Sequence, residues 1–218
     1  EERRVAAKLH RRLDDVVGGY DDTKRKLRQA ISIALNQEEF IQIFLNGRGI
    51  SAQGPLPPEI FGFQEGKAGL NPIVYDWDEQ RQAPRRKSLD EAKRLLTEAG
   101  YPEGRDTTGK PLILFFDTAA ASGAATPQLE WLRKQFATLG LQLQIRSTDY
   151  NRFQEKVLKG NFQILQWGWN ADYPDPENFL FLLYGPNSKV KAQGENAANY
   201  ENPRFDALFR QVENMQNS

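Results

Sequence analysis

Apolar residues recur at helical spacing in the first half of the chain. From residue 27 they occupy positions i, i+3, i+4, i+7 and i+8, as Leu27, Ala30, Ile31, Ala34 and Leu35. This spacing predicts a helix with one apolar face. Asn36 and Glu39 have the residue types of a helix start, so we expect a second, short helix that ends near Phe44. Ser88 and Glu91 form the same kind of capping pattern and predict a third helix.

Residues 46–87 show no such periodicity. They are rich in glycine and proline, and the stretch from Gly54 to Pro58 is the stiffest part. We expect a long irregular segment here, and such segments more often form packed surfaces or binding loops than plain connectors.

Strand and helix patterns alternate between residues 112 and 167. Apolar or alternating runs predict strands over 112–116, 141–145 and 162–167, and capped amphipathic patterns predict helices over 126–139 and 149–159. Strands joined in this way by helices become parallel neighbours with right-handed crossovers. We therefore expect an α/β fold.

Two more helices are predicted where Asp175 and Asn202 each precede a proline. In the second of these helices, the apolar residues expected to face inward are Phe205, Leu208, Phe209, Val212 and Met215.

Composition narrows the functional classes. The chain has 29 basic and 29 acidic residues, a single histidine and no cysteine. A formal net charge of zero argues against bulk attraction to nucleic acid, and no apolar run is long enough to cross a bilayer. The absence of thiols and of a second histidine disfavours cysteine, Ser–His–Asp and zinc chemistry. We expect no catalytic residues, no metal site and no cofactor, which favours a binding protein over a catalyst.

The candidate binding residues lie in the segment from Trp167 to Glu177. It contains two tryptophans, a tyrosine and several carboxylates directly after the third predicted strand. In open α/β sheets, ligands bind beyond the carboxyl ends of strands. Aromatic side chains offer rigid contact area there, and a carboxylate can meet a cation. If the strand pleat continued, Trp167 and Trp169 would share one face.

Each of these residues also has an ordinary structural interpretation. Asp175 is most simply a helix cap, Glu177 a surface residue of the first turn, and Trp167 a core residue. Asp172 can be either a turn former or a charge that faces a ligand. A carboxylate-based glycosidase that uses Asp172 and Asp175 is a second hypothesis.

With the segment Trp169–Phe179 in view, the chain resembles the family-5 solute-binding proteins of bacterial ABC importers, which include oligopeptide and dipeptide receptors. Further segments are similar to motifs of that family in the same order: Leu27–Asn36, Asn46–Pro58, Leu89–Gly104 and Asn199–Asp206. Several ordered motifs are far more specific than a single one.

The resemblance implies a lobe like that of type II periplasmic binding proteins, with a mixed, largely parallel sheet flanked by helices. Residues 1–20 would be an N-terminal or hinge-side segment, with a weak helical pattern over 1–17, and residues 21–218 the C-terminal ligand-binding lobe of a longer two-lobe protein. The signal peptide would lie outside this sequence. The full-length receptor would be a periplasmic or cell-surface-anchored monomer that delivers a small solute to a membrane permease, without inserting this segment into the membrane or binding nucleic acid.

The resemblance also implies roles for individual residues. In peptide-binding members, the aspartate three residues after the motif tryptophan holds the α-ammonium group of the ligand. By motif position that role falls on Asp172, with Trp169 lining the same pocket and with Asn170, Tyr173 and Trp167 as further ligand-binding candidates. The family also includes receptors for sugars and other solutes, so a carbohydrate receptor of the same family is an alternative to a peptide receptor.

Overall fold

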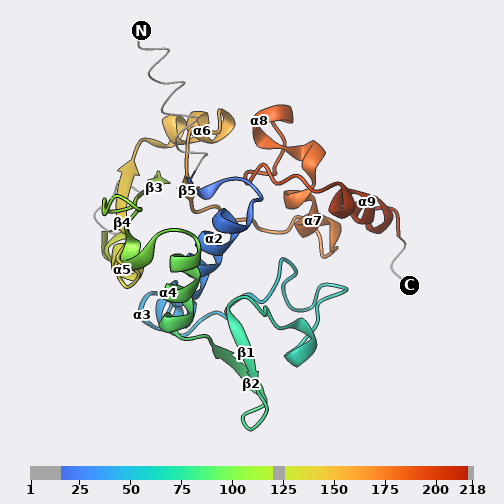
Figure 1. Ribbon diagram of the computed structural model, residues 1–218. Helices are drawn as coiled ribbons and strands as arrows, with labels where there is room; N and C mark the ends of the chain where they lie inside the picture. Colours follow the sequence, from blue (N-terminus) through green and yellow to red (C-terminus); the bar gives the residue numbers. More distant parts are fainter. Residues whose placement is uncertain (1–15, 120–125, 216–218) are drawn as a thin grey trace. The chain divides into compact units, whose positions relative to one another are not determined.

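The computed structural model describes residues 16–119 and 126–215 (Figure 1). The weak helical pattern predicted over residues 1–17 lies almost entirely outside these residues. The chain divides into two compact units. The first contains residues up to Ser51 together with Asn71–Asp149 and Phe162–Leu165, and the second contains Ala52–Leu70, Tyr150–Asn161 and the chain from Gln166 onward.

Three parallel strands form the sheet of the first unit, in the order β4–β3–β5. The central strand β3 (Ile113–Thr118) pairs with β4 (Gln142–Ser147) on one side and with β5 (Ile164–Leu165) on the other. Leu114 is paired with Leu143 in this register, so their side chains lie on one apolar face. The parallel sheet and its flanking helices confirm the predicted α/β class.

The third strand is shorter than predicted. The expected strand over residues 162–167 is wrong at both ends, because only Ile164 and Leu165 pair with β3. The side-chain oxygen of Gln163 accepts a hydrogen bond of 2.8 Å from the Phe115 backbone N–H, so a side chain takes the place of a backbone partner just before the strand.

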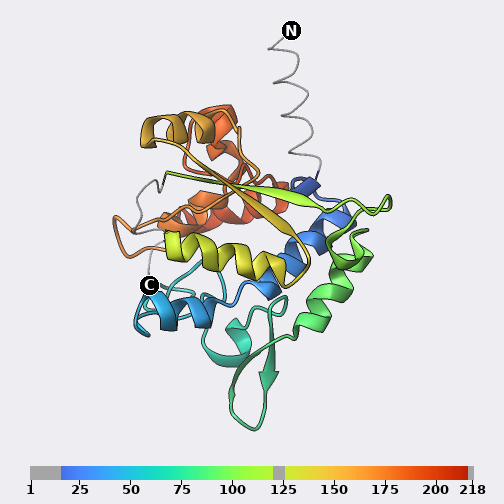
Figure 2. The same ribbon diagram turned by 90° about the vertical axis from the view of Figure 1, so that its left-hand side faces the viewer.

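Helices cover the apolar face of the sheet. α2 (Asp22–Ala34) packs with α4 (Leu89–Glu98) and α5 (Thr126–Ala137), and Figure 2 shows α5 (yellow) running along the sheet. Their buried side chains form one cluster with those of the strands, which includes Leu27, Ala30, Leu96, Leu114 and Phe136. Each large apolar side chain in such a core contributes about 1.5–3 kcal/mol relative to its exposed state.

The predicted helix starts of the first unit are confirmed. Asn36 accepts a hydrogen bond of 3.1 Å from the Glu39 N–H at the start of α3 (Gln37–Phe44). Ser88 accepts one of 3.3 Å from the Glu91 N–H at the start of α4. Each cap satisfies a backbone donor that the helix itself leaves unpaired.

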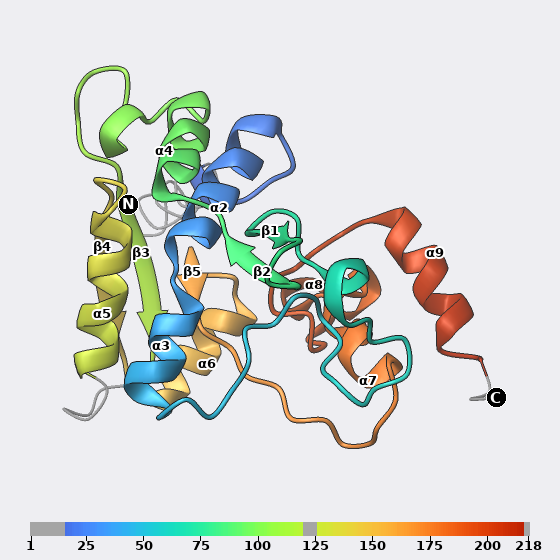
Figure 3. The ribbon, with the colours of Figure 1, turned by 90° about the horizontal axis from the view of Figure 1, so that it is seen from below.

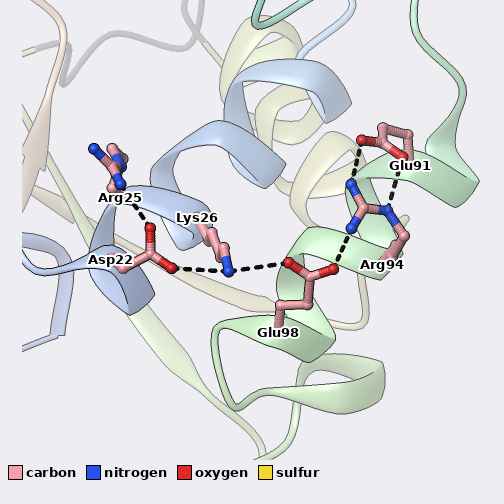
Figure 4. Close-up of polar contacts among 6 residues, drawn as sticks. All are labelled: Asp22, Arg25, Lys26, Glu91, Arg94 and Glu98. Atoms are coloured by element: carbon pink, nitrogen blue, oxygen red, sulfur yellow. Dashed lines mark hydrogen bonds and ion pairs between the residues drawn. The ribbon is translucent and has the colours of Figure 1, made fainter.

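A chain of exposed and half-buried charged side chains connects α2 to α4 (Figure 4). Lys26 Nζ lies 2.8 Å from Asp22 and 3.1 Å from Glu98, and Arg94 pairs with Glu98 and Glu91. The side-chain hydrogen bonds from Lys26 and Arg25 lower the pKa of Asp22. Because solvent screens surface pairs, the apolar contacts between these helices contribute more to stability than the ion pairs do.

The irregular segment predicted over residues 46–87 contains a hairpin that sequence periodicity missed. Strand β1 (Tyr75–Asp78) pairs antiparallel with β2 (Ala83–Arg86), and both are visible near α2 in Figure 3. The prediction of a wholly irregular segment is therefore wrong. The strands are only four residues long and mostly polar, and Tyr75 is their one buried residue, so no alternating apolar pattern marks them.

The second unit is built from short helices (Figure 1). In chain order, they are the 3₁₀ turn Gly66–Gly69, α6 (Tyr150–Leu158), α7 (Glu177–Leu180), the 3₁₀ turns Phe181–Leu183 and Gly185–Asn187, α8 (Lys189–Ala192) and α9 (Pro203–Val212). Asn196 is fully buried among them, and its amide donates to the Tyr184 and Tyr200 carbonyl oxygens and accepts from the Tyr200 N–H. A buried polar side chain whose hydrogen bonds are all satisfied makes the packing around it more rigid and more specific.

The last helix begins as predicted, because the Asn202 side chain accepts hydrogen bonds from the Arg204 and Phe205 N–H groups. The predicted inward positions are only partly right. Phe209 is buried, but Leu208 is 53% and Met215 62% exposed. The helix ends at Val212, so Met215 lies beyond its apolar stripe, and Leu208 is rotated away from the buried side that its neighbour Phe209 occupies.

Candidate functional site

The segment that carries all five predicted ligand-binding residues has no helix or strand of its own. It runs from the end of β5 to the start of α7, as the orange connection in Figure 3 shows. Its conformation therefore depends on hydrogen bonds and ring contacts made by individual side chains.

Asn178, in the first turn of α7, organises this segment. Its side chain is only 3% exposed, and its oxygen accepts a hydrogen bond of 3.2 Å from the Trp169 indole and one of 3.0 Å from the Asp172 backbone N–H. The Trp169 ring also meets Phe181 edge-to-face, with ring centroids 5.2 Å apart. One buried amide thus brings together the two residues most strongly predicted to bind a ligand.

The carboxylate of Asp172 is exposed and makes no hydrogen bond or ion pair within the described residues. Its backbone, in contrast, is held in place by Asn178. A fixed backbone that presents a free carboxylate beside a partly buried indole is suited to meet a cationic group.

Tyr173 and the two following carboxylates form a tight turn. Asp175 accepts a hydrogen bond of 2.8 Å from the Glu177 N–H. The N-cap residue of α7 is Pro176, so the prediction of Asp175 as the helix cap is wrong by one residue. The Tyr173 hydroxyl donates to the Glu177 carboxylate, and this hydrogen bond raises the pKa of Tyr173. The Asp175 carboxylate is thus engaged at the start of α7, which is a structural role rather than the general acid or base role that the glycosidase hypothesis would give it.

Trp167 belongs to a different cluster. Its ring stacks on Phe153 of α6 with centroids 6.0 Å apart, and the Lys189 ammonium lies 5.6 Å from its ring centroid. Lys189 is 6% exposed and pairs with Glu195 at 3.0 Å. Because β5 ends at Leu165, the strand pleat that would place Trp167 and Trp169 on one face does not continue.

The structure therefore brings Trp169 and Asp172 together, places Tyr173 on the adjoining turn, and leaves Asn170 exposed. Trp167 has contacts of its own. Sequence reasoning missed Asn178, Phe181 and Lys189. Asn178 lies inside the family-like segment Trp169–Phe179, but only its burial and its hydrogen bonds reveal its role.

The described part of the chain has neither a cluster of metal ligands nor a helix suited to span a membrane. Within residues 16–119 and 126–215, no three histidine, cysteine or acidic side chains are grouped so that they could hold a metal ion. Over the same ranges, none of the helices combines the length and apolar character that a bilayer crossing requires.

Comparison with known proteins identifies relatives. The chain is 28% identical over 189 residues to the heme-binding protein A of Haemophilus influenzae, covering 86% of this chain and 30% of the relative. It is 26% identical over 187 residues to the dipeptide-binding protein of Escherichia coli, covering 85% of this chain and 31% of the relative. The chain thus spans about a third of the length of the curated relatives it matches.

A solved structure shares the fold. The dipeptide-binding protein of Pseudoalteromonas in complex with Met-Leu matches with a TM-score of 0.64 and 27% identity, over 85% of this chain and 32% of that protein. The model of the bacterial extracellular solute-binding proteins, family 5 (middle region), matches residues 19–191. This match includes the helical core, the parallel sheet and the segment around Trp169 and Asp172, and the chain belongs to the family-5 bacterial extracellular solute-binding proteins.

Proposed function

We propose that this chain is part of the substrate-binding component of a bacterial ABC importer, which captures a short peptide and delivers it to a membrane permease. The family match and the names of several relatives as peptide-binding proteins support this function. The observation that carries it is the exposed Asp172 carboxylate, free of partners among the described residues, beside an indole fixed by Asn178.

In this proposal Asp172 holds the α-ammonium group of the peptide. Burial of a cation requires a close counter-charge, and a carboxylate that is not already paired supplies one. The Trp169 ring forms an adjacent wall, while Asn170 and Tyr173 are near in sequence and exposed enough to contact a ligand. A ligand-binding role is less well supported for Trp167, because its ring already contacts Phe153 and Lys189.

The chain would form the C-terminal ligand-binding lobe over residues 21–218, with residues 1–20 on the hinge side, and the rest of the receptor would supply the second half of the site. Domain closure would then exclude water from the bound ammonium group. The complete receptor would be a monomer in the periplasm or at the cell surface, and would act by binding without catalysing a reaction.

Mass spectrometry of the solute that co-purifies with the two-lobe receptor tests this proposal. We expect short peptides with free amino termini, and we expect the 218-residue chain alone to retain them weakly because half of the pocket is absent. A co-purified sugar would instead support the carbohydrate-receptor alternative. Tight calorimetric binding of peptides by the chain alone would contradict the two-lobe arrangement.

A further inference from the structure

Among the described lysines and arginines, Lys189 alone is almost fully buried, with 6% of its surface exposed. It lies in α8, which is next to α6 in the second unit (Figure 1). A lysine ammonium loses its water on burial, so it is stable there only beside groups that replace the water. The partners of Lys189 therefore indicate what its position serves.

Two groups take the place of water around the Lys189 ammonium. The Glu195 carboxylate lies 3.0 Å from Nζ, and the ammonium lies over the Trp167 ring, 5.6 Å from the ring centroid. The backbone brings these groups together, because the Lys189 N–H donates a hydrogen bond of 3.0 Å to the carbonyl oxygen of Asn196, the residue after Glu195. An ion pair and a backbone hydrogen bond thus hold the charge over the indole.

Trp167 is fixed by a second contact as well. Its ring stacks on Phe153 of α6, and Phe153 is only 5% exposed. Trp167 follows the last residue of β5 by two positions, so it stands at the start of the segment that carries the predicted binding residues. The contacts of Trp167 therefore set the position of the first part of this segment.

Asn178 holds the segment further along, through its hydrogen bonds with Trp169 and Asp172. Between the two tryptophans lies Gly168, which is exposed, and a Cβ atom added to it would meet nothing within 4 Å. Packing therefore does not hold the chain at Gly168, and its position depends on the contacts on either side. Loss of the Trp167 contacts should consequently shift the Trp169 indole, which lies beside Asp172.

The charge of Lys189 is not needed to fill space. A buried ion pair contributes little net stability compared with apolar side chains of the same size, while its hydrogen-bond geometry restricts how the charge can lie. The face of an indole attracts a cation, which gives the Trp167 ring a preferred orientation. We infer that Lys189 is a positioning residue of the candidate site, which orients Trp167 and thereby places Trp169 before a ligand arrives. This inference rests on the proposed function, because it concerns the same site, and it assigns Lys189 no contact with the ligand.

The four tryptophans of the chain make the positions of the indoles measurable. Trp167 and Trp169 belong to the second unit, whereas Trp77 and Trp131 belong to the first and serve as internal references. The 218-residue chain is labelled with 5-fluorotryptophan, and each ¹⁹F signal is assigned by substituting one tryptophan at a time. The change in each signal between H₂O and D₂O then reports how far that ring is exposed to solvent.

Lys189→Met keeps an unbranched side chain of similar length but removes the charge. We expect the rings of Trp167 and Trp169 to become more exposed in this variant, so that their solvent isotope shifts increase while the two reference signals stay unchanged. Lys191→Met is the matched control, because Lys191 lies in the same helix but is 67% exposed and pairs with Glu201. It should leave all four signals as they are.

The affinity of the two-lobe receptor for trialanine measures the consequence for the site. We expect Lys189→Met to weaken binding about three- to tenfold, which is within the range of a desolvated cation–π contact. Lys191→Met should bind like the parent. If the parent receptor does not bind trialanine, the proposed function fails, and the ¹⁹F signals still decide whether Lys189 positions the segment.

Four results would overturn the inference. Lys189→Met leaves both signals of the second unit unchanged, alters Trp167 without Trp169, alters the reference signals equally, or acts no more strongly than Lys191→Met. Should Lys189→Met not fold, Trp167→Phe replaces it, because the smaller ring attracts a cation less strongly. The Trp169 signal must then change in the same direction, and an unchanged signal would overturn the inference.

Discussion

The side-chain oxygen of Asn178 lies 3.2 Å from the Trp169 indole nitrogen. The same oxygen accepts from the Asp172 N–H, so a single buried acceptor holds two donors of a segment that has no secondary structure. The geometry of the candidate site therefore depends on a residue that need not touch the ligand.

Asn178→Ala should destabilise the chain by about 1–3 kcal/mol, because it leaves two donors without their acceptor. Urea unfolding monitored by tryptophan fluorescence measures this change. Asn170→Ala is the matched control, since Asn170 is exposed and lies in the same segment. Equal stability of the two variants would show that the Asn178 hydrogen bonds do not hold the segment.

Sequence patterns predicted the features that depend on residues close together along the chain. The caps at Asn36, Ser88 and Asn202 and the apolar face around Leu27 are local, and the structure confirms them. The roles of Asn178 and of the β1–β2 hairpin could not be predicted, because they rest on contacts that polar residues make only after folding.

Glu38 connects the hairpin to the first helices and should make stability depend on pH. Burial on its own would raise the pKa of the Glu38 carboxyl, but hydrogen bonds from Tyr75, Ser51 and Arg86 outweigh burial and lower it to about 2. A pKa lowered in the folded state adds stability that is present above the unfolded-state value of about 4.5 and is lost as pH falls towards 2.

Glu38→Gln should therefore reduce stability at pH 7 and have a smaller effect near pH 2. The carboxylate is half exposed and partly screened by solvent. We therefore expect the loss of stability caused by Glu38→Gln to be about 1 kcal/mol larger at pH 7 than near pH 2, which is less than the full value that the pKa shift implies. Urea midpoints measured across this pH range check it. A variant whose loss of stability is the same at both ends of the range would rule out this role for Glu38.

Gly104 and Gly140 approach each other closely in the first unit. A Cβ atom added to Gly104 would lie 2.3 Å from the backbone carbonyl atoms of Gly140, and the φ angle of Gly104 is +74°. Gly104→Ala should therefore lower the free energy of unfolding by more than the strain of a positive φ angle alone would. Gly109 is the matched control, because its φ is +80° and its added Cβ would meet nothing within 4 Å.

We expect Gly104→Ala to be less stable than Gly109→Ala by about 1–3 kcal/mol, the usual cost of inserting atoms into a packed site. Thermal or urea unfolding of the two variants gives the comparison. Indistinguishable variants would show that the backbone can move apart at Gly140 without cost.

We propose above all that Asp172 binds the α-ammonium group of a peptide. Isothermal titration calorimetry on the two-lobe receptor tests it most directly, with one peptide in two forms, bearing a free or an acetylated amino terminus. We expect Asp172→Asn to weaken the free-amino peptide by about 2–5 kcal/mol and to leave the affinity of the acetylated peptide nearly unchanged. An Asp172→Asn receptor that binds the free-amino peptide as tightly as the parent would contradict the account.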